Sequence, residues 1–134
     1  MPKQNKALIS TIKISKQMKV NLDYLKDMSA GNTELVKEII EIFCEQTTQI
    51  QENMLTSIKT EEWPGLAQLA HKAKASVVMM GMEETALSLK QLETLAKEEK
   101  KTEIYAEIVD NFITDTNNII KELKIIQHEP EKYI

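Results

Sequence analysis

Apolar residues recur at every third or fourth position over most of the chain, which is the spacing that gathers them on one face of an α-helix. The longest pattern starts near Asn32 or Thr33 and runs to about Ile58, with a predicted core stripe of Val36, Ile39, Phe43, Thr47, Ile50, Met54 and Ile58. The clearest pattern covers about residues 102–127, with Tyr105, Ile108, Phe112, Thr116, Ile119, Leu123 and Ile126. Alternation typical of β-strands is nearly absent, so the pattern predicts an all-α protein.

Three shorter helices are predicted around these two. The first spans 21–28, with Asn21 as its N-cap, and is broken at Gly31. Another begins after Thr60, which offers a cap, and ends near Gly81, with a core stripe of Leu66, Leu69, Ala73 and Met80. The last covers about 83–99 and is expected to bury Ala86, Leu89, Leu92 and Ala96.

Short connections between the long helices make successive helices antiparallel neighbours. The predicted fold is therefore an antiparallel up-and-down four-helix bundle with a short extra N-terminal helix. Residues 1–20 are the least patterned and form a predicted N-terminal arm, 21–127 the bundle, and 128–134 a C-terminal tail. A start at Met1 and an end soon after the last helix favour a free-standing protein.

Composition and charge limit which classes of function are possible for this chain. A chain of 134 residues with 42% hydrophobic and 28% charged residues fits one compact domain. The net charge is −4, and no basic stripe with interleaved aromatic residues points to nucleic acid. No apolar run approaches the roughly 20 residues of a membrane span, and no secretory signal is evident. Cys44 is the single cysteine, which excludes an internal disulfide and indicates a cytoplasmic protein.

His71 is the residue with the most distinctive candidate chemistry. By the helical spacing of roughly 100° per residue it lies opposite the apolar stripe of its helix, so it faces solvent or a partner. An exposed imidazole is a nucleophile near neutral pH, and Lys74, three residues on, is close enough to reach an anion attached to it. The face around His71 suits protein docking because its side chains are small and its rim is apolar. The predicted partner-binding residues are Ala67, Gln68, Ala75, Val78 and Met82.

Helical periodicity alone leaves other classes open, because an exposed histidine is most often just a polar residue. One alternative is a phosphorylation-independent helical adaptor that binds partner proteins through the face around His71. A metal-dependent bundle enzyme has less support, because Gln68 instead of glutamate stands three residues before His71 and His128 lacks comparable neighbours. Glycine motifs that bind ATP are absent, which argues against an autonomous enzyme.

The segment Leu69-Ala70-His71-Lys72-Ala73-Lys74-Ala75-Ser76, followed by Met80-Gly81-Met82, resembles the signature of histidine-containing phosphotransfer (HPt) domains of two-component phosphorelays. The likeness covers about residues 21–126, including Asn21-Leu22-Asp23-Tyr24-Leu25, Gly31-Asn32, Ile42-Phe43 and Leu92-Glu93. The family most often has glycine where this chain has Ala75, and leucine where it has Ala73. Alanine at the first position adds a methyl group beside the histidine but keeps the site open.

The resemblance implies a specific role for this face. His71 would be the phosphoacceptor, through Nε2, and Lys74 the cation beside the phosphate. The chain would be a phosphoprotein intermediate that takes a phosphoryl group from a receiver-domain aspartate and passes it to another receiver aspartate. Its partners would be response-regulator receiver domains and a hybrid sensor histidine kinase. It would need no cofactor, since Mg²⁺ is expected on the partner receiver, and would be a phosphocarrier without catalysis of its own.

Overall fold

The computed structural model describes residues 19–134, so nearly all of the predicted N-terminal arm lies outside the described residues. Its helices are α2 (Leu22–Ser29), α3 (Thr33–Thr60), α4 (Trp63–Met79), α5 (Glu83–Glu98), α6 (Tyr105–His128) and α7 (Pro130–Tyr133), with a 3₁₀ turn η1 (Thr102–Ile104) before α6. No strand occurs between residues 19 and 134. The predicted all-α bundle is confirmed.

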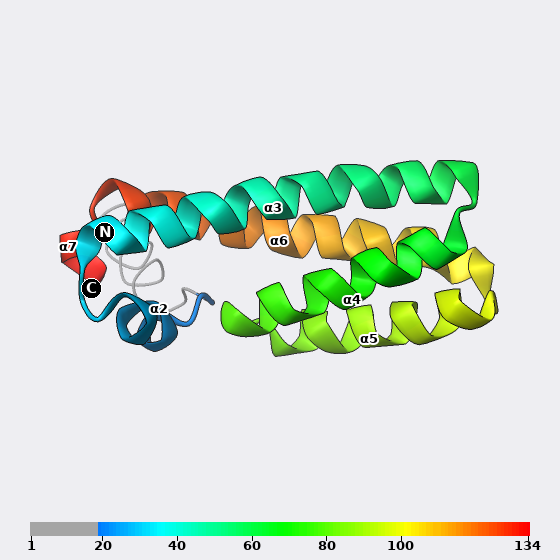
Figure 1. The fold of residues 1–134 in the computed structure, drawn as a ribbon, viewed down its shortest axis with the longest axis horizontal. Helices are drawn as coiled ribbons and strands as arrows, with labels where there is room; N and C mark the ends of the chain where they lie inside the picture. Colours follow the sequence, from blue (N-terminus) through cyan, green and yellow to red (C-terminus); the bar gives the residue numbers. More distant parts are fainter. Residues whose placement is uncertain (1–18) are drawn as a thin grey trace, which may run out of the picture.

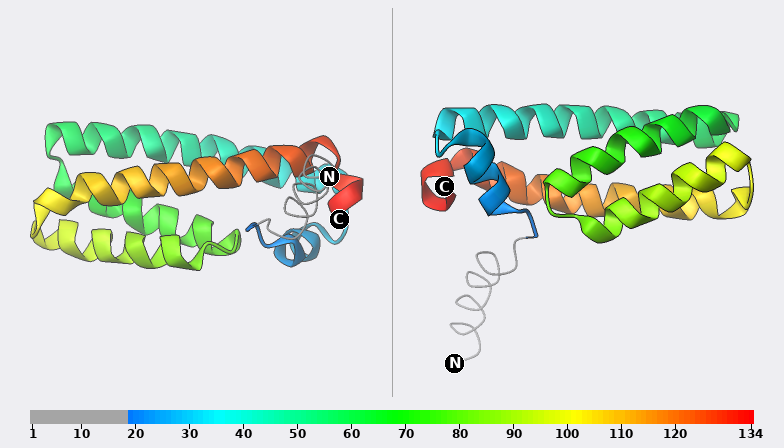
Figure 2. Two further views of the ribbon diagram at one scale, coloured as in Figure 1. Left: turned by 180° about the vertical axis from the view of Figure 1, so that it is seen from behind. Right: turned by 60° about the horizontal axis from the view of Figure 1, so that its bottom comes forward.

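Four helices form the body of the bundle, and the chain reverses direction between each and the next (Figure 1). α4 packs most extensively on α5, and α3 packs on both α6 and α4. The helices α3 and α6 have 28 and 24 residues, whereas α4 and α5 have only 17 and 16. The longer pair therefore extends past the shorter pair, and α2 and α7 lie at that end (Figures 1 and 2).

The core is built from the apolar stripes of these helices. The predicted stripes of α3, α5 and α6 are buried except for Ile39, Ile58 and Ile108, which are half-buried. The stripe of α4 differs from the prediction, because Ala70 and Val77 are fully buried and Leu69 only partly so. By helical spacing, the buried side of α4 is centred about 120° from His71, not about 180°.

Side-chain caps set the helix starts, and one of the predicted caps is wrong. Asn21 Oδ1 accepts a hydrogen bond from the Tyr24 N–H at 2.9 Å, as expected for the N-cap of α2. Thr60, predicted to cap α4, is the last residue of α3, because the left-handed turn comes only at Glu61 (φ 55°). The N-cap of α4 is Glu62, whose Oε1 accepts from the Gly65 N–H at 3.3 Å. In the predicted C-terminal tail, residues 130–133 form α7.

Residues Lys19–Asn21, the N-terminal strap, tie the start of the described chain to two distant elements. The Asn21 N–H donates to the Met80 carbonyl at 3.1 Å, in the turn between α4 and α5. The Glu122 Oε1 on α6 accepts from the N–H groups of Lys19 at 2.7 Å and Val20 at 3.2 Å. Val20, the middle residue of the strap, is buried in the core. The strap therefore links the start of the described chain to α6 and to the α4–α5 turn.

None of the helices described in residues 19–134 is both long enough and apolar enough to cross a bilayer.

Because Gly81 has no side chain, the strap can pass close to the α4–α5 turn. The variant Gly81→Ala tests this contact. Its φ is +81°, and a Cβ added there would lie 3.2 Å from Asn21 Cβ and 3.3 Å from the Lys19 carbonyl oxygen. We expect Gly81→Ala to lower the free energy of unfolding by about 2–3 kcal/mol, of which about 1–2 kcal/mol is the left-handed backbone cost. Equilibrium urea denaturation measures it.

Gly31→Ala is the matched control. Gly31 has a similar φ of +77°, but nothing lies within 4 Å of an added Cβ. Gly31→Ala should therefore lower the free energy of unfolding only by the cost of the left-handed backbone. Equal losses in the two variants would contradict a tight contact between the strap and the turn.

Candidate functional site

His71 lies in the middle of α4 and exposes 69% of its side chain. Its outward orientation agrees with the sequence prediction. Because α4 is packed along its length against α5 and α3, the backbone that carries the imidazole is rigid. The side chain is therefore held at a fixed place on the surface while remaining open to a partner.

Small residues bring α5 close to the His71 side of α4. Ala67, Ala70 and Ala73 are all buried on α4, and Ala86 and Ala96 are buried on α5. The distance between packed helices depends on the size of the side chains at the contact, so alanines on both helices allow a close approach. This packing lets a side chain of α5 reach the imidazole.

Glu93 of α5 is that side chain, and it gathers three donors. Its Oε2 lies 2.9 Å from His71 Nδ1, and its Oε1 accepts from Lys74 Nζ at 3.1 Å. Lys97 Nζ, one turn further along α5, lies 3.2 Å from Oε2. The carboxylate exposes only 10% of its side chain, whereas Lys74 and Lys97 expose 30% and 65%. A nearly buried negative charge thus lies beneath a histidine and two lysines.

The three donors keep Glu93 ionised although it is shielded from water. Burial disfavours the charged carboxylate and by itself raises the pKa. The hydrogen bonds from Lys74, Lys97 and His71 outweigh burial and lower the pKa of Glu93 from 4.5 to about 2. Glu93 is therefore a carboxylate at any pH near neutrality, and it acts only as an acceptor.

This contact selects one tautomer of His71. A carboxylate acceptor at Nδ1 requires that Nδ1 carry the proton. In the neutral imidazole the lone pair then lies on Nε2, which points away from Glu93. The geometry thus makes Nε2 the nucleophilic nitrogen and holds the ring in a single orientation, in the way a carboxylate orients a catalytic histidine.

The structure separates the predicted docking residues into two groups. Gln68, Ala75 and Val78 are exposed on the same side as His71, and these four residues are called the His71 face below. Ala67 and Met82 are buried, with 2% and 8% exposure, so their prediction as partner-binding surface is corrected. The reason is the rotation of the buried side of α4 toward α5, which covers Ala67. Met79 is exposed at the end of the face.

Sequence reasoning gave Glu93 no role, although a signal was present. On α5 the core stripe runs through Ala86, Leu89 and Ala96. Helical spacing places Glu93 on that same side, four residues after Leu89 and three before Ala96. A charged residue in an apolar stripe requires a buried partner, because an unpaired buried charge is costly. That partner could have been sought on α4.

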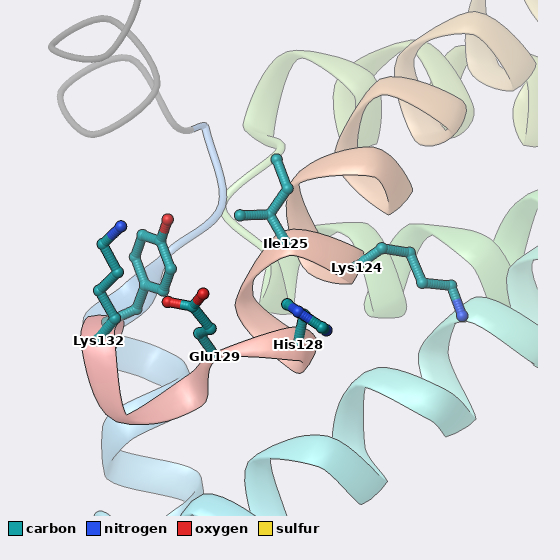
Figure 3. A pocket seen from close by; sticks show the side chains of 6 residues that line it. Lys124, Ile125, His128, Glu129 and Lys132 are labelled. Atoms are coloured by element: carbon teal, nitrogen blue, oxygen red, sulfur yellow. The ribbon is translucent and has the colours of Figure 1, made fainter.

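The other histidine lies elsewhere. His128 ends α6 and lines a surface pocket of about 460 Å³ at the corner between α6 and α7, together with Lys124, Ile125, Glu129, Lys132 and Tyr133 (Figure 3). This corner is at the end of the bundle occupied by α2 and α7 (Figure 1). Within the described part of the chain, no group of three or more His, Cys, Asp or Glu residues could hold a metal ion.

Comparison with known families identifies the class of this bundle. The family model described as Hpt domain matches residues 38–126, from the second turn of α3 to the last turn of α6, and includes both His71 and Glu93. The match covers more than half of the chain, which therefore belongs to the Hpt domain family, as the resemblance implied. Hpt domains are phosphocarriers without catalytic activity that take part in histidine phosphotransfer in two-component signalling, through receiver domains and kinases. Comparisons with curated proteins and with solved structures give no match.

Ionised Glu93 should make the stability of the fold depend on pH. The folded-state pKa lies below 4.5, so the stabilisation is present above about pH 4.5 and is lost as the pH falls through about 2. We expect Glu93→Gln to unfold more easily than the parent chain at pH 7. The expected difference is on the order of 1 kcal/mol, because solvent screens the exposed His71 and Lys97.

Denaturant unfolding between about pH 2 and pH 7 measures this difference, which should shrink toward the acid end. Glu52→Gln, at an exposed position on α3, is the control and should give a small difference without that trend. A Glu93→Gln difference that is constant over the range would contradict the assigned contacts.

Proposed function

We propose that this protein is a phosphorelay intermediate in which His71 Nε2 accepts a phosphoryl group from a receiver-domain aspartate and passes it to the aspartate of another receiver. The observation that carries the proposal is the 2.9 Å contact between His71 Nδ1 and Glu93 Oε2. With the proton on Nδ1, the lone pair lies on Nε2, where it can attack an incoming phosphoryl group. The family match supports the reaction class, and the site geometry supports the choice of atom.

The transfer is a displacement at phosphorus. The Nε2 lone pair forms the N–P bond while the P–O bond to the donor aspartate breaks, and the aspartate leaves as a carboxylate. The ring, still protonated at Nδ1, becomes cationic, and the Glu93 carboxylate beside Nδ1 stabilises that charge. The return step reverses these bond changes with a second aspartate. Any Mg²⁺ that neutralises the phosphoryl oxygens belongs to the partner receiver in this proposal.

Lys74 is proposed as the cation nearest to the bound phosphate. It lies one turn after His71 and is now paired with Glu93 Oε1 at 3.1 Å. A phosphoryl group on Nε2 carries about two negative charges and would compete with Glu93 for this ammonium. Lys97, paired with Oε2 at 3.2 Å, is a second cation at the same carboxylate. The two lysines can offset the phosphoryl charge without a new element moving into the site.

The His71 face is proposed as the docking surface for the receivers and for a hybrid sensor histidine kinase, in the cytoplasm. Gln68, Ala75 and Val78 surround the imidazole with short or uncharged side chains, which permits close approach of another protein. The same exposure would serve an adaptor that binds partners without phosphorylation. The two functions differ in their dependence on the imidazole.

His71→Gln should abolish phosphate uptake from a phosphorylated receiver. The parent chain should acquire a label that is stable in alkali and lost in acid, as expected for a phosphoramidate. His128→Gln removes the only other histidine of the chain and should leave uptake unchanged. Phosphate uptake by His71→Gln would contradict the assignment of His71 as the acceptor, whereas binding and signalling that persist undiminished in that variant would favour the adaptor.

Two variants of Glu93 separate the effect of its hydrogen bond to His71 from the effect of its negative charge. Glu93→Ala removes the acceptor at Nδ1, so both tautomers become populated and the cationic ring loses its counter-charge. We expect its first-order transfer rate at saturating phosphorylated receiver to fall about tenfold or more. Glu93→Gln retains an oxygen acceptor without the charge and should show a smaller loss. Equal rates for the parent chain and Glu93→Ala would exclude the orienting role.

A further inference from the structure

Leu87 on α5 is the most exposed of the large hydrophobic side chains in residues 19–134. It exposes 68% of its surface, and Val78 on the neighbouring helix α4 exposes 50%. A single exposed leucine is ordinary, because apolar atoms make up much of any protein surface. What distinguishes Leu87 and Val78 is their position relative to His71.

Helical spacing places Leu87 on the same side of the bundle as His71. Glu93 meets His71 Nδ1 at 2.9 Å and thus marks the edge of α5 that faces α4. Leu87 is turned by about 120° from Glu93. The buried residues Leu89 and Leu92 are turned by about 40° and 100° in the opposite sense, toward the core. Leu87 therefore faces outward beside α4, and the two helices lie side by side (Figure 1).

Val78 and Leu87 lie at about the same height on the two antiparallel helices. Val78 comes seven residues after His71, and Leu87 six residues before Glu93. At 1.5 Å per residue they lie about 10 Å and 9 Å from those residues, in both cases toward the α4–α5 turn. The axes of packed helices are about 8–10 Å apart, so Leu87 lies about 13 Å from His71. Val78 and Leu87 are called the apolar patch below.

The surface closest to His71 is cationic instead. Lys74 and Lys97 pair with Glu93 at 3.1 and 3.2 Å. Lys90 is exposed about one turn before Glu93, on the flank of α5 that also carries Lys97. Cations suit the place where a phosphoryl group arrives, and apolar area suits the place where the rest of a partner packs. The two kinds of surface are thus arranged in order from His71 toward the α4–α5 turn.

A protein that brings a phosphoryl group to His71 covers the apolar patch as well. A standard interface buries about 800 Å² on each partner, which corresponds to a disc of roughly 16 Å radius. Such a disc centred on His71 includes Leu87. Two side chains provide too little apolar area for a lasting dimer of this chain, because obligate dimers bury about 2,000 Å² or more in total. A partner that transfers a group and then leaves needs only a small apolar contact.

We infer that Val78 and Leu87 are the apolar contact of a docking surface that spans α4 and α5. Its partner is a receiver domain that carries an apolar patch of its own about 13 Å from the phosphorylated aspartate. This inference rests on the proposed phosphotransfer. It gives α5 two roles, because Glu93 orients the imidazole and Leu87 holds the partner over it. Removal of both apolar surfaces from water stabilises the complex.

Two substitutions of Leu87 separate its apolar character from its size. Glutamine and methionine are similar in length and both favour helices, so Leu87→Gln and Leu87→Met should leave the fold intact. Transfer to the full chain is measured against the concentration of a receiver domain, phosphorylated with acetyl phosphate, that labels the parent chain. Leu87→Gln should raise the half-saturating concentration about tenfold and leave the first-order rate at saturation unchanged. Leu87→Met should behave like the parent chain.

Leu55→Gln is the matched control. Leu55 on α3 exposes 49% and lies by helical spacing about 40° from Glu41, which pairs with Lys124 of α6. It is therefore an exposed leucine on the side of the bundle formed by α3 and α6, and its substitution should change neither kinetic parameter. Equal effects of Leu55→Gln and Leu87→Gln would overturn the inference, as would an unchanged half-saturating concentration in Leu87→Gln.

The remaining outcomes separate this inference from the function on which it rests. A parent chain that no phosphorylated receiver labels would refute the proposed phosphotransfer and the inference with it. Normal transfer by Leu87→Gln would overturn the inference alone. Sedimentation equilibrium tests a second copy as the occupant: a dimer that Leu87→Gln dissociates would assign the apolar patch to self-association and also overturn it. A monomeric parent chain, together with the expected tenfold rise, supports the receiver.

Discussion

The geometry of the site depends on one buried carboxylate, Glu93, placed between α4 and α5. A charge with so little exposure is tolerated only when hydrogen-bonded, and His71, Lys74 and Lys97 provide the donors. In return the carboxylate fixes the imidazole ring, selects its tautomer and holds two cations beside it. The interaction thus joins the packing of the bundle to the chemistry of its surface, because Glu93 reaches His71 only where alanines let α5 approach α4.

The bundle separates a rigid part from an accessible part. Long helices α3 and α6 form one side (Figure 1), and the short pair α4 and α5 carries the site, with His71 in the middle of α4. Because α4 is shorter than α3, its C-terminal end is available for the N-terminal strap, which reaches Met80 and Glu122. The place where the chain enters the bundle is thereby tied to the surface that presents His71.

Charge and packing act at different ranges in this arrangement. Close to the imidazole, Glu93 and its donors set the protonation of the ring through contacts of about 3 Å. Further out, the helix that carries His71 has two lysines and no acidic residue, whereas the chain as a whole is acidic, at −4. The first effect concerns the transfer of the phosphoryl group and survives salt. The second concerns how a partner arrives and is screened by it.

The sequence by itself determined the helices, their approximate ends, the all-α bundle and the outward orientation of His71, because helical periodicity and caps such as Asn21 are local signals. The family signature added the reaction class. The tertiary structure decided what depends on neighbouring helices. It turned the buried side of α4 toward α5, covered Ala67, brought Glu93 to Nδ1 and joined Asn21 to Met80. None of these follows from periodicity, since a single helix pattern gives the direction of its apolar face only approximately and does not identify the residue that meets it.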